Sequence, residues 1–200
     1  MGGPLEGLKV LDIATIIAAP LAATLLADYG AEVLKIEMPG QGDGIRSFPP
    51  FKDGKPLWWK AANRNKKFAT LDLRTPEGLA LFKQMLPRFD VLIENFRPGT
   101  LDRWGLSKEI LWSIQPRLVI LRATAFGQDG PYSSRPGFAR IFEAMGGLTY
   151  ITARPTENPR IPDTRSGIRS VACSAPLACS RPCGRERETR MLLVRRSISR

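Results

Sequence analysis

Short apolar runs alternate with longer amphipathic or alanine-rich segments along the chain. The runs predict five buried strands, at residues 9–14, 31–37, 68–73, 90–96 and 117–127. The segments between and after them predict helices at 18–29, 75–88 and 137–147, with two short helical pieces within 99–114. Residues 148–152 are expected to form a further short strand, and residues 38–59 a long loop rich in glycine and proline.

Several helix ends carry recognisable signals. Pro20 suits the first turn of the first helix and Gly30 its C-terminal stop, while Thr75 suits an N-cap with Pro76 following it. Strands that alternate with helices imply an α/β fold, with a Rossmann-like parallel sheet flanked by helices. Ligands of such sheets bind beyond the carboxyl ends of the strands, which are expected near residues 14–17, 37–44, 94–97 and 124–128.

Composition narrows the class of protein. The chain has 200 residues, 43% of them apolar and 24% charged, which is typical of one globular domain. No apolar run is long enough to span a membrane, and the start "MGGPLEGLKVLDI" lacks the pattern of a signal peptide, so a cytoplasmic location without a membrane partner is expected. The absence of histidine excludes a Ser-His-Asp triad, a Cys-His pair and any histidine metal site, and no metal is expected.

The net charge of +11 is unevenly distributed. Residues 163–200 contain nine arginines and three acidic residues, a net charge of +6, so residues 1–162 account for +5. This mildly basic body is compatible with a polyanionic ligand. It shows no clear basic face of the kind that binds nucleic acid, and no nucleic-acid partner is expected. A basic nucleic-acid-binding protein that uses the arginine-rich tail remains the alternative from a different class.

Four stretches could carry chemistry, and each has a plain structural alternative. "PGQGDGIR" (residues 39–46) is either a flexible loop or a loop whose backbone approaches a ligand, and its GxGxG spacing without a following helix is a weak dinucleotide signal. "NRNKK" (residues 63–67) is either a solvated basic turn or a phosphate clamp. "ENFRPG" (residues 94–99) is a capped turn or part of a site, and "AFGQDGPY" (residues 125–132) alone indicates only a turn.

Taken together, four longer segments are specific. They are "GLKVLDIATIIAAPLAATLLADYGAEVLKIEMPGQGD", "NRNKKFATLDLRTPEG", "DVLIENFRPGTLDRWGL" and "FGQDGPYSSRPGF". In this order and spacing, over about residues 5–152, they resemble the family III CoA-transferases, the family that includes formyl-CoA transferase, carnitine CoA-transferase and the α-methylacyl-CoA racemases. The resemblance implies an enzyme that moves coenzyme A from an acyl-CoA to a carboxylic acid through an aspartyl anhydride and an enzyme-CoA thioester. It also implies that backbone N–H groups stabilise the oxyanions of this reaction. Full-length members of the family are about twice as long as this chain and form interlocked homodimers.

The resemblance also assigns residues that bind coenzyme A. The positions that match the family's CoA-binding residues are Leu71, Arg74, Asn95, Phe96, Arg103 and Trp104. Leu71 and Phe96 are expected to line the nucleotide, and Arg74 and Arg103 to meet its phosphates. Arg64 and Lys66 are added from the possible phosphate clamp.

Three positions depart from the family pattern. Ile17 stands where several transferases place a glutamine beside the active site, and Met38 stands where some members have a phosphate-binding arginine, for which Arg46 or Arg64 is a candidate replacement. Phe138 stands where the racemases have a histidine. A two-base racemisation lacks one base without it, which favours a transferase and leaves an acyl-CoA racemase or epimerase as the alternative.

The family pattern stops before the end of the chain. The Gly-Asp motif that bears the family's nucleophilic aspartate is not found, and the remaining candidate is Asp163, in a context that does not match. We therefore divide the chain into a partial CoA-transferase domain, residues 1–162, and an unrelated tail, residues 163–200, which is expected to be disordered. The product is expected to be a fragment with little activity.

The genetic code offers an origin for this tail. Residues 173–184 can be encoded so that the frame starting at the third base of the first codon gives LGALGVLAALW, which resembles a helix of the family. In the same offset, residues 195–200 can give EIDLS, which resembles a following strand. These two segments favour a frameshift after about Asp163, and the alternative is a genuine basic tail. The three cysteines, at 173, 179 and 183, match no common metal pattern.

Overall fold

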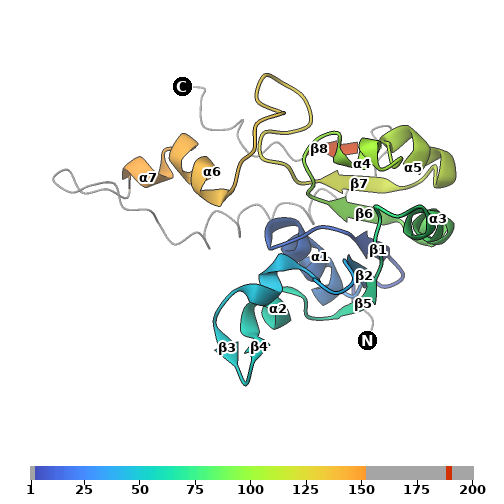
Figure 1. The fold of residues 1–200 in the computed structure, drawn as a ribbon, viewed down its shortest axis with the longest axis horizontal. Coiled ribbons are helices and arrows are strands. Elements are labelled where there is room, and N and C mark those ends of the chain that lie inside the picture. Colours follow the sequence, from blue (N-terminus) through green and yellow to red (C-terminus); the bar gives the residue numbers. More distant parts are fainter. Residues whose placement is uncertain (1–2, 152–187, 191–200) are drawn as a thin grey trace.

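The computed structural model describes residues 3–151 and 188–190, and it contains a six-stranded sheet (Figure 1). Every pairing within this sheet is parallel, and the strand order is β5-β2-β1-β6-β7-β8. The strands are β1 (Lys9–Asp12), β2 (Glu32–Glu37), β5 (Lys66–Thr70), β6 (Val91–Glu94), β7 (Val119–Arg122) and β8 (Glu188–Arg190). The α/β, Rossmann-like fold expected from the sequence is confirmed.

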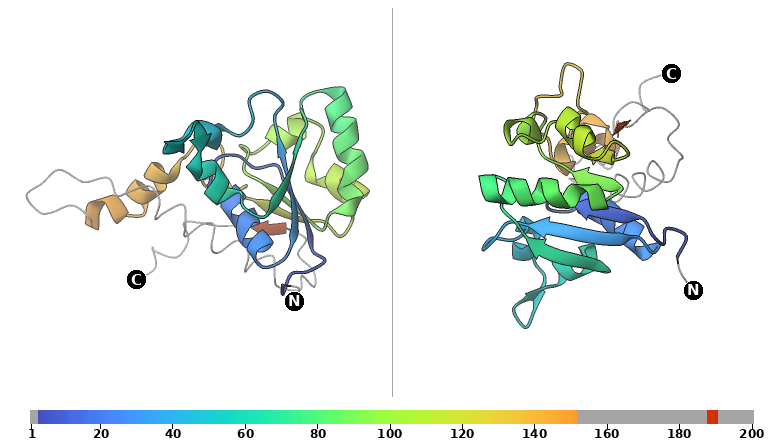
Figure 2. Two further views of the ribbon diagram at one scale, coloured as in Figure 1. Left: turned by 90° about the horizontal axis from the view of Figure 1, so that it is seen from below. Right: turned by 90° about the vertical axis from the view of Figure 1, so that its right-hand side faces the viewer.

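Helices cover both faces of the sheet (Figure 2). Helix α1 (Ala18–Asp28) packs its alanines and Leu26 against the valines of β1, β2 and β6 on one face. The opposite face packs against α3 (Pro76–Met85), the 3-10 turn η2 (Leu86–Arg88), α4 (Thr100–Arg103) and α5 (Lys108–Ile114). Because both faces are covered, the central strands are mainly apolar on both sides, as their apolar runs predicted, and Asp12 of β1 and Lys35 of β2 are buried exceptions.

The predicted helix boundaries hold where capping signals are strong. The Thr75 hydroxyl accepts a hydrogen bond from the Gly78 N–H at 3.1 Å, and Pro76 is the first helical residue of α3. Gly30, with φ of +101°, follows α1 in a conformation that favours glycine.

The long loop predicted after β2 contains more structure than expected. It includes a 3-10 turn η1 (Gly44–Ser47), the hairpin β3 (Phe51–Lys52) and β4 (Lys55–Pro56), and helix α2 (Leu57–Ala62). The hairpin turns at Asp53 and Gly54, whose φ angles are both positive. An Asp-Gly pair between strands is a strong hairpin signal that the sequence contained. The hairpin projects from the body of the molecule in Figure 1.

Two further elements differ from the sequence-based expectation. The strand expected at residues 148–152 is not found in its described part, because Leu148–Ile151 is helix α7, separated from α6 (Ala139–Met145) by Gly146 and Gly147, the second with φ of +77°. A short apolar run does not distinguish strand from helix by period, which explains the error. Three residues of the tail expected to be disordered form β8, beside β7. Within the described residues, no helix is long and apolar enough to cross a membrane.

Candidate active site

The carboxyl ends of β1, β2, β5 and β6 meet at one edge of the sheet, as a parallel sheet requires. The backbone pairing continues past the strands there: the Leu71 N–H donates to the Glu37 carbonyl at 2.9 Å, and the Ala123 N–H donates to that of Glu94 at 2.9 Å. This edge is where ligands of open parallel sheets bind. It therefore places the segments after four strands, 13–17, 38–47, 71–75 and 95–97, next to one another.

Four buried charged residues lie just inside this edge, and we refer to Asp12, Lys35, Asp43 and Lys66 as the charge cluster. The side chains of Lys35 and Asp12 have no exposed surface, and Lys35 Nζ lies 3.0 Å from Asp43 Oδ2 and 3.9 Å from Asp12 Oδ2. Lys66 Nζ lies 2.8 Å from the same Asp12 oxygen. Two positive and two negative charges thus balance in a region without solvent, where an unpaired charge would be costly.

The turn between β1 and α1 is held by side chains from distant segments. The Asp43 carboxylate accepts a hydrogen bond from the Ile16 N–H at 2.8 Å, and Lys35 Nζ donates to the Ala14 carbonyl at 2.7 Å. The Asn95 amide accepts from the Thr15 N–H at 2.9 Å and donates to the Thr15 carbonyl at 2.8 Å. Asn95, a predicted coenzyme-binding residue, therefore also fixes the backbone of this turn.

An aromatic corner formed by Phe96 and Trp104 lies beside it, and Leu71 packs against the same core cluster. The Phe96 and Trp104 rings meet edge to face with centroids 5.1 Å apart, and all three side chains pack, partly exposed, against the core under α3–α5. Positions 71, 96 and 104, which the resemblance assigns to coenzyme binding, thus pack against one core cluster, and their role in coenzyme binding stays a prediction. Such a partly exposed apolar surface suits the flat face of a base.

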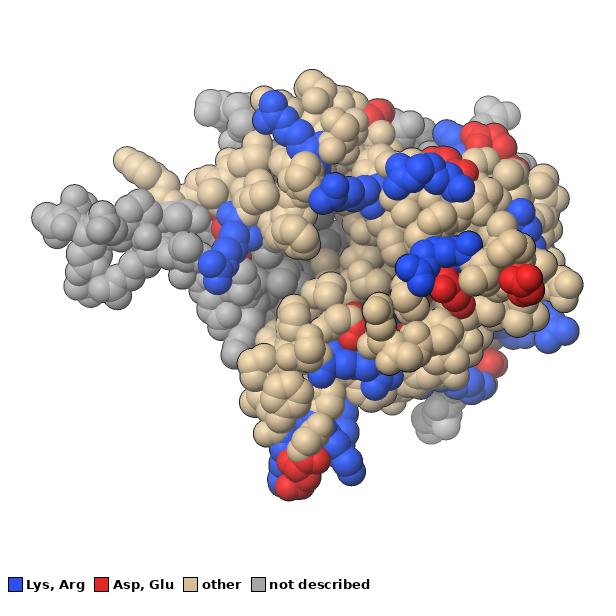
Figure 3. Space-filling model, in the orientation of Figure 1, with Lys and Arg blue, Asp and Glu red and all other residues tan. Residues whose placement is uncertain are grey.

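Two predicted phosphate ligands, Arg74 and Arg103, are exposed. Arg74 is exposed and forms a bidentate pair with Asp72 (2.8 and 2.9 Å), which lowers the pKa of the Asp72 carboxyl to about 2. Its Nη2 also lies 3.2 Å from the Met38 sulfur, so the guanidinium reaches the position where some family members carry an arginine. Arg103 is exposed, and its guanidinium donates a hydrogen bond to the Thr100 hydroxyl at 3.1 Å. Lys and Arg side chains are spread around the hollow on this face of the molecule (Figure 3).

Arg46 lies closer to the charge cluster and is already engaged. It pairs with Glu37 at 2.7 Å and stacks over the Trp59 ring, 3.8 Å from its centroid. Burial raises the pKa of Glu37, but hydrogen bonds from Arg46, the Asp43 N–H and the Trp59 indole N–H outweigh it and leave the pKa below its usual value. Glu37 is therefore an anion that anchors the 38–47 loop.

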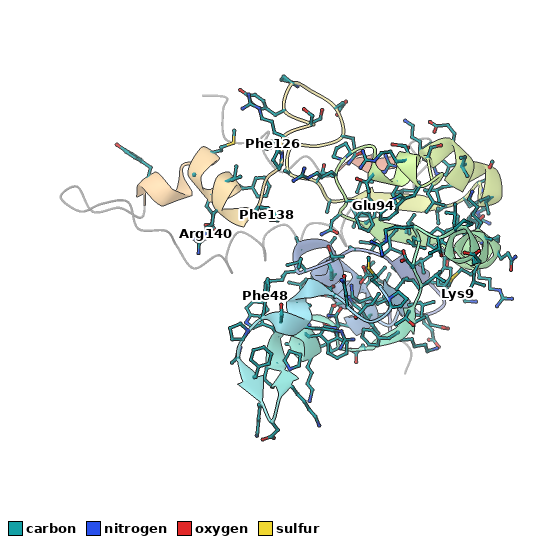
Figure 4. The ribbon with its side chains drawn as sticks, in the orientation of Figure 1. Lys9, Phe48, Glu94, Phe126, Phe138 and Arg140 are labelled. Carbon is teal, nitrogen blue, oxygen red and sulfur yellow. The ribbon has the colours of Figure 1, made fainter. Side chains whose placement is uncertain are left out.

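Glu94 is the most perturbed acid of the edge. It is 3% exposed at the end of β6, accepts a hydrogen bond from the Phe96 N–H at 2.7 Å, and lies 3.5 Å from Arg122 Nε. Burial is the main cause that raises its pKa, to about 7, although the Phe96 N–H and Arg122 act in the opposite direction. Figure 4 shows Glu94 at the end of its strand, with Phe126, Phe138 and Arg140 on the side of the molecule that carries α6.

The two other predicted phosphate ligands, Arg64 and Lys66, form ion pairs with acidic residues of this chain. Arg64 pairs with Asp28 at the end of α1, with its Nε 3.1 Å from Oδ1, at the amino edge of the sheet. Lys66 is buried in the charge cluster, where its ammonium donates to Asp12, the Pro20 carbonyl and Asn63 at 2.7–3.0 Å. Burial lowers the pKa of Lys66, and all three of its N–H donors are occupied, so this geometry does not favour a phosphate role.

The remaining sequence candidates are placed as follows. Phe138 precedes α6 and is 74% exposed, and Ile17 is buried against Ile45 and Ala62. Asp163 lies outside the described residues. Residues 3–151 and 188–190 hold no group of three or more His, Cys, Asp or Glu side chains arranged for a metal ion.

Sequence reasoning missed the charge cluster and Glu94. A signal for Lys35 was present, because a lysine inside the apolar run "EVLKIE" has nowhere to go in a sheet covered on both faces. Asp12, 23 positions before it, carries the same signal inside "KVLDIA", whereas Asp43, 8 positions after it in the Gly-rich loop, does not. Glu94 likewise follows an apolar run, and the sequence left its stretch open between a capped turn and part of a site, without singling out Glu94.

Comparison with known proteins defines the class. The family model of CoA-transferase family III matches residues 5–179, so the chain belongs to this family. The match extends past residue 152, where the resemblance to the family's motifs ends, and past Asp163.

Among named proteins, the chain is similar to two from Chloroflexus aurantiacus. It is 51% identical to the succinyl-CoA–L-malate CoA-transferase beta subunit over 160 residues, 80% of this chain and 40% of that protein. It is 48% identical to succinyl-CoA–D-citramalate CoA-transferase over 166 residues, 82% of this chain and 40% of that protein. The fold matches a CAIB/BAIF family protein from Brucella suis with a TM-score of 0.83 and 36% identity, covering 96% of this chain and 54% of that one. The chain thus spans about 40% of the length of the curated relatives it matches.

Proposed function

We propose that this chain is the coenzyme-binding part of a CoA-transferase, which moves coenzyme A from an acyl-CoA to a carboxylic acid. The observation that carries the proposal is the partly exposed Phe96–Trp104 pair next to the exposed Arg103, at the same edge of the sheet where the segment with Leu71 and Arg74 follows β5. Coenzyme A has the matching chemistry, an adenine next to anionic phosphates. Arginine is well suited to phosphate oxygens because its planar fork donates two parallel hydrogen bonds.

The names of the relatives suggest the substrate class. The Chloroflexus proteins are named for succinyl-CoA, L-malate and D-citramalate. The corresponding free acids, succinate, malate and citramalate, each carry two carboxylates. We propose that the whole protein acts on acids of this dicarboxylic class. In the proposed reaction an enzyme carboxylate attacks the thioester carbonyl and expels the CoA thiolate, which leaves a mixed anhydride. The thiolate then attacks the enzyme carbonyl of this anhydride, which releases the donor acid and forms an enzyme-CoA thioester. The acceptor carboxylate attacks that thioester to form a second mixed anhydride, and the expelled thiolate attacks its acyl carbonyl, which gives the new acyl-CoA and restores the enzyme carboxylate.

A racemase of the same family remains the second candidate and is disfavoured by Phe138. Its ring carries no group that accepts a proton, and it occupies the position of the racemase histidine. We also propose that the whole protein is a cytoplasmic homodimer without a metal, as the resemblance implies, and that the tail after about residue 163 is a frameshift product.

Calorimetric titration of the 200-residue chain with coenzyme A tests the binding part of this proposal. Wild-type protein should bind, and Arg103→Ala should weaken binding by about tenfold, because one charge-assisted phosphate contact is lost. Arg88→Ala is the matched control: Arg88 is also exposed, but it precedes β6 and so lies at the amino edge of the sheet. Equal weakening by both variants, or no binding by wild type, would contradict the assignment.

A further inference from the structure

The backbone of the turn at residues 14–16 is unusually well tied. The N–H of Ala14 donates to Asp12 at 3.1 Å, and its carbonyl accepts from Lys35 at 2.7 Å. Both backbone groups of Thr15 are bonded to Asn95, and the N–H of Ile16 is bonded to Asp43. Five consecutive polar groups of one loop are thus satisfied by side chains, whereas loops usually rely on solvent and on their own backbone.

The same turn contains a strained residue. Ile16 has φ of +69°, in the left-handed region that a β-branched side chain rarely occupies. Strain of this kind persists only when surrounding contacts determine the conformation, and it is concentrated at functional sites. The contact that fixes Ile16 is the 2.8 Å bond from its N–H to Asp43.

Asp43 is itself held from three sides. Its Oδ1 also accepts from the Ile45 N–H at 3.1 Å, its own N–H donates to Glu37 at 3.0 Å, and its Oδ2 faces Lys35 at 3.0 Å. Asp43 is 2% exposed. A carboxylate so enclosed has one available position, so the Gly-rich 39–44 loop delivers a fixed acceptor to the turn.

We propose that Asp43 and Lys35 are positioning residues, which lock the 14–16 turn and, through it, the Asn95 amide at the edge of the coenzyme site. Asn95 bridges the locked turn to Phe96, the first residue of the aromatic corner, and so transmits the geometry to the ligand side. This inference rests on the proposed function. It also accounts for the Gly-rich loop, whose role here is to present Asp43 rather than to bind a phosphate directly.

The test compares Asp43→Ala with Asp43→Asn in the 200-residue chain. Asparagine keeps the Oδ1 acceptor for Ile16 but loses the charge that balances Lys35, whereas alanine loses both. We expect both variants to melt at lower temperature than wild type, because each leaves Lys35 with a weaker opposite charge. Only the alanine variant should release the turn, with exchange of the Ile16 amide proton faster by about tenfold or more in NMR and the Kd for coenzyme A higher by about tenfold. The asparagine variant should stay within about threefold of wild type in both.

Controls keep the outcomes distinct. Glu32→Ala removes a carboxylate from an exposed ion pair with Lys67 at the amino edge and should change neither amide exchange nor the Kd. If Asp43→Ala does not fold, the same comparison is made with Lys35→Met added to each variant, which removes the unpaired charge and leaves Asp12 and Lys66 balanced. If asparagine and alanine weaken coenzyme binding equally, in step with their loss of melting temperature, the positioning role is overturned. If wild type does not bind coenzyme A, the proposed function fails, while the exchange of the Ile16 amide still decides whether Asp43 locks the turn.

Discussion

Ile16 adopts a conformation that its own side chain opposes. Its Cβ branch crowds the backbone at φ of +69°, while its side chain packs against the small cluster around Ile17, Ile45 and Ala62. These two effects have opposite signs for stability, and they can be separated because alanine keeps the Cβ and glycine does not.

We therefore predict that Ile16→Gly is at least as stable as Ile16→Ala. Both lose the same packing beyond Cβ, but glycine relieves about 1 kcal/mol of left-handed strain, which offsets its larger backbone entropy. Urea denaturation of the two variants measures the difference. A glycine variant less stable than the alanine variant by 1 kcal/mol, the usual order elsewhere in a chain, would show that the turn is not strained.

Glu94 makes a pH-dependent contribution to stability. Its pKa rises from 4.5 to about 7, chiefly because of burial, so the folded protein holds a proton that the unfolded chain releases between these values. Stability from this group is fully present below about pH 4.5 and is lost as pH rises toward 7, by about 3 kcal/mol in total.

Glu94→Gln should remove this slope, because glutamine can still accept from the Phe96 N–H but does not titrate. Urea midpoints at pH 5 and pH 7.5, for wild type and the variant, provide the measurement. The drop in midpoint between the two pH values should be smaller for the variant, and an equal drop in both proteins would assign the titration to other groups.

At the scale of elements, the sequence predicted the order of the strands and helices but not the contacts between individual buried charges. The order of strands and helices followed from apolar runs and from caps such as Thr75, whose 3.1 Å bond to Gly78 fixes the start of α3. The pairing of the four buried charges could not be foreseen, since Asp43 and Lys66 look like ordinary surface residues until the sheet brings β1, β2 and β5 together.

The candidate site divides along the same line. Leu71, Phe96 and Trp104 were assigned to coenzyme binding through the family resemblance, and the structure shows Phe96 and Trp104 in contact and all three packed against one core cluster. Lys66 was assigned to a phosphate from its basic neighbours alone. Composition gives the charge of such a segment but not the face on which each side chain emerges, and in β5 Lys66 points into the interior.

At the scale of the whole molecule, the chain matches about 40% of the length of its named relatives. We predict that the 200-residue product transfers coenzyme A slowly or not at all, because the Gly-Asp motif that bears the family's nucleophilic aspartate is not found in its sequence. A version with the reading frame restored after about residue 163 should gain turnover from succinyl-CoA to malate or citramalate.

Sequencing of the gene and a transfer assay on both products check this expectation. If no single-base change in the gene restores a segment such as LGALGVLAALW, the frameshift explanation fails. Appreciable turnover by the 200-residue chain would instead show that it carries its own nucleophile, with Asp163 as the first residue to replace.

The charge cluster also limits how this protein can change. Lys35 and Lys66 have no exposed side-chain surface, and neither do their partners apart from 1% of Asp43. Replacement of any one of the four leaves an ion in the interior with no counterpart, whereas removal of one cation and one anion together preserves neutrality. Single substitutions in this part of the core should therefore lower stability more than the paired replacement of one cation and one anion, so variation there is expected to occur in matched pairs.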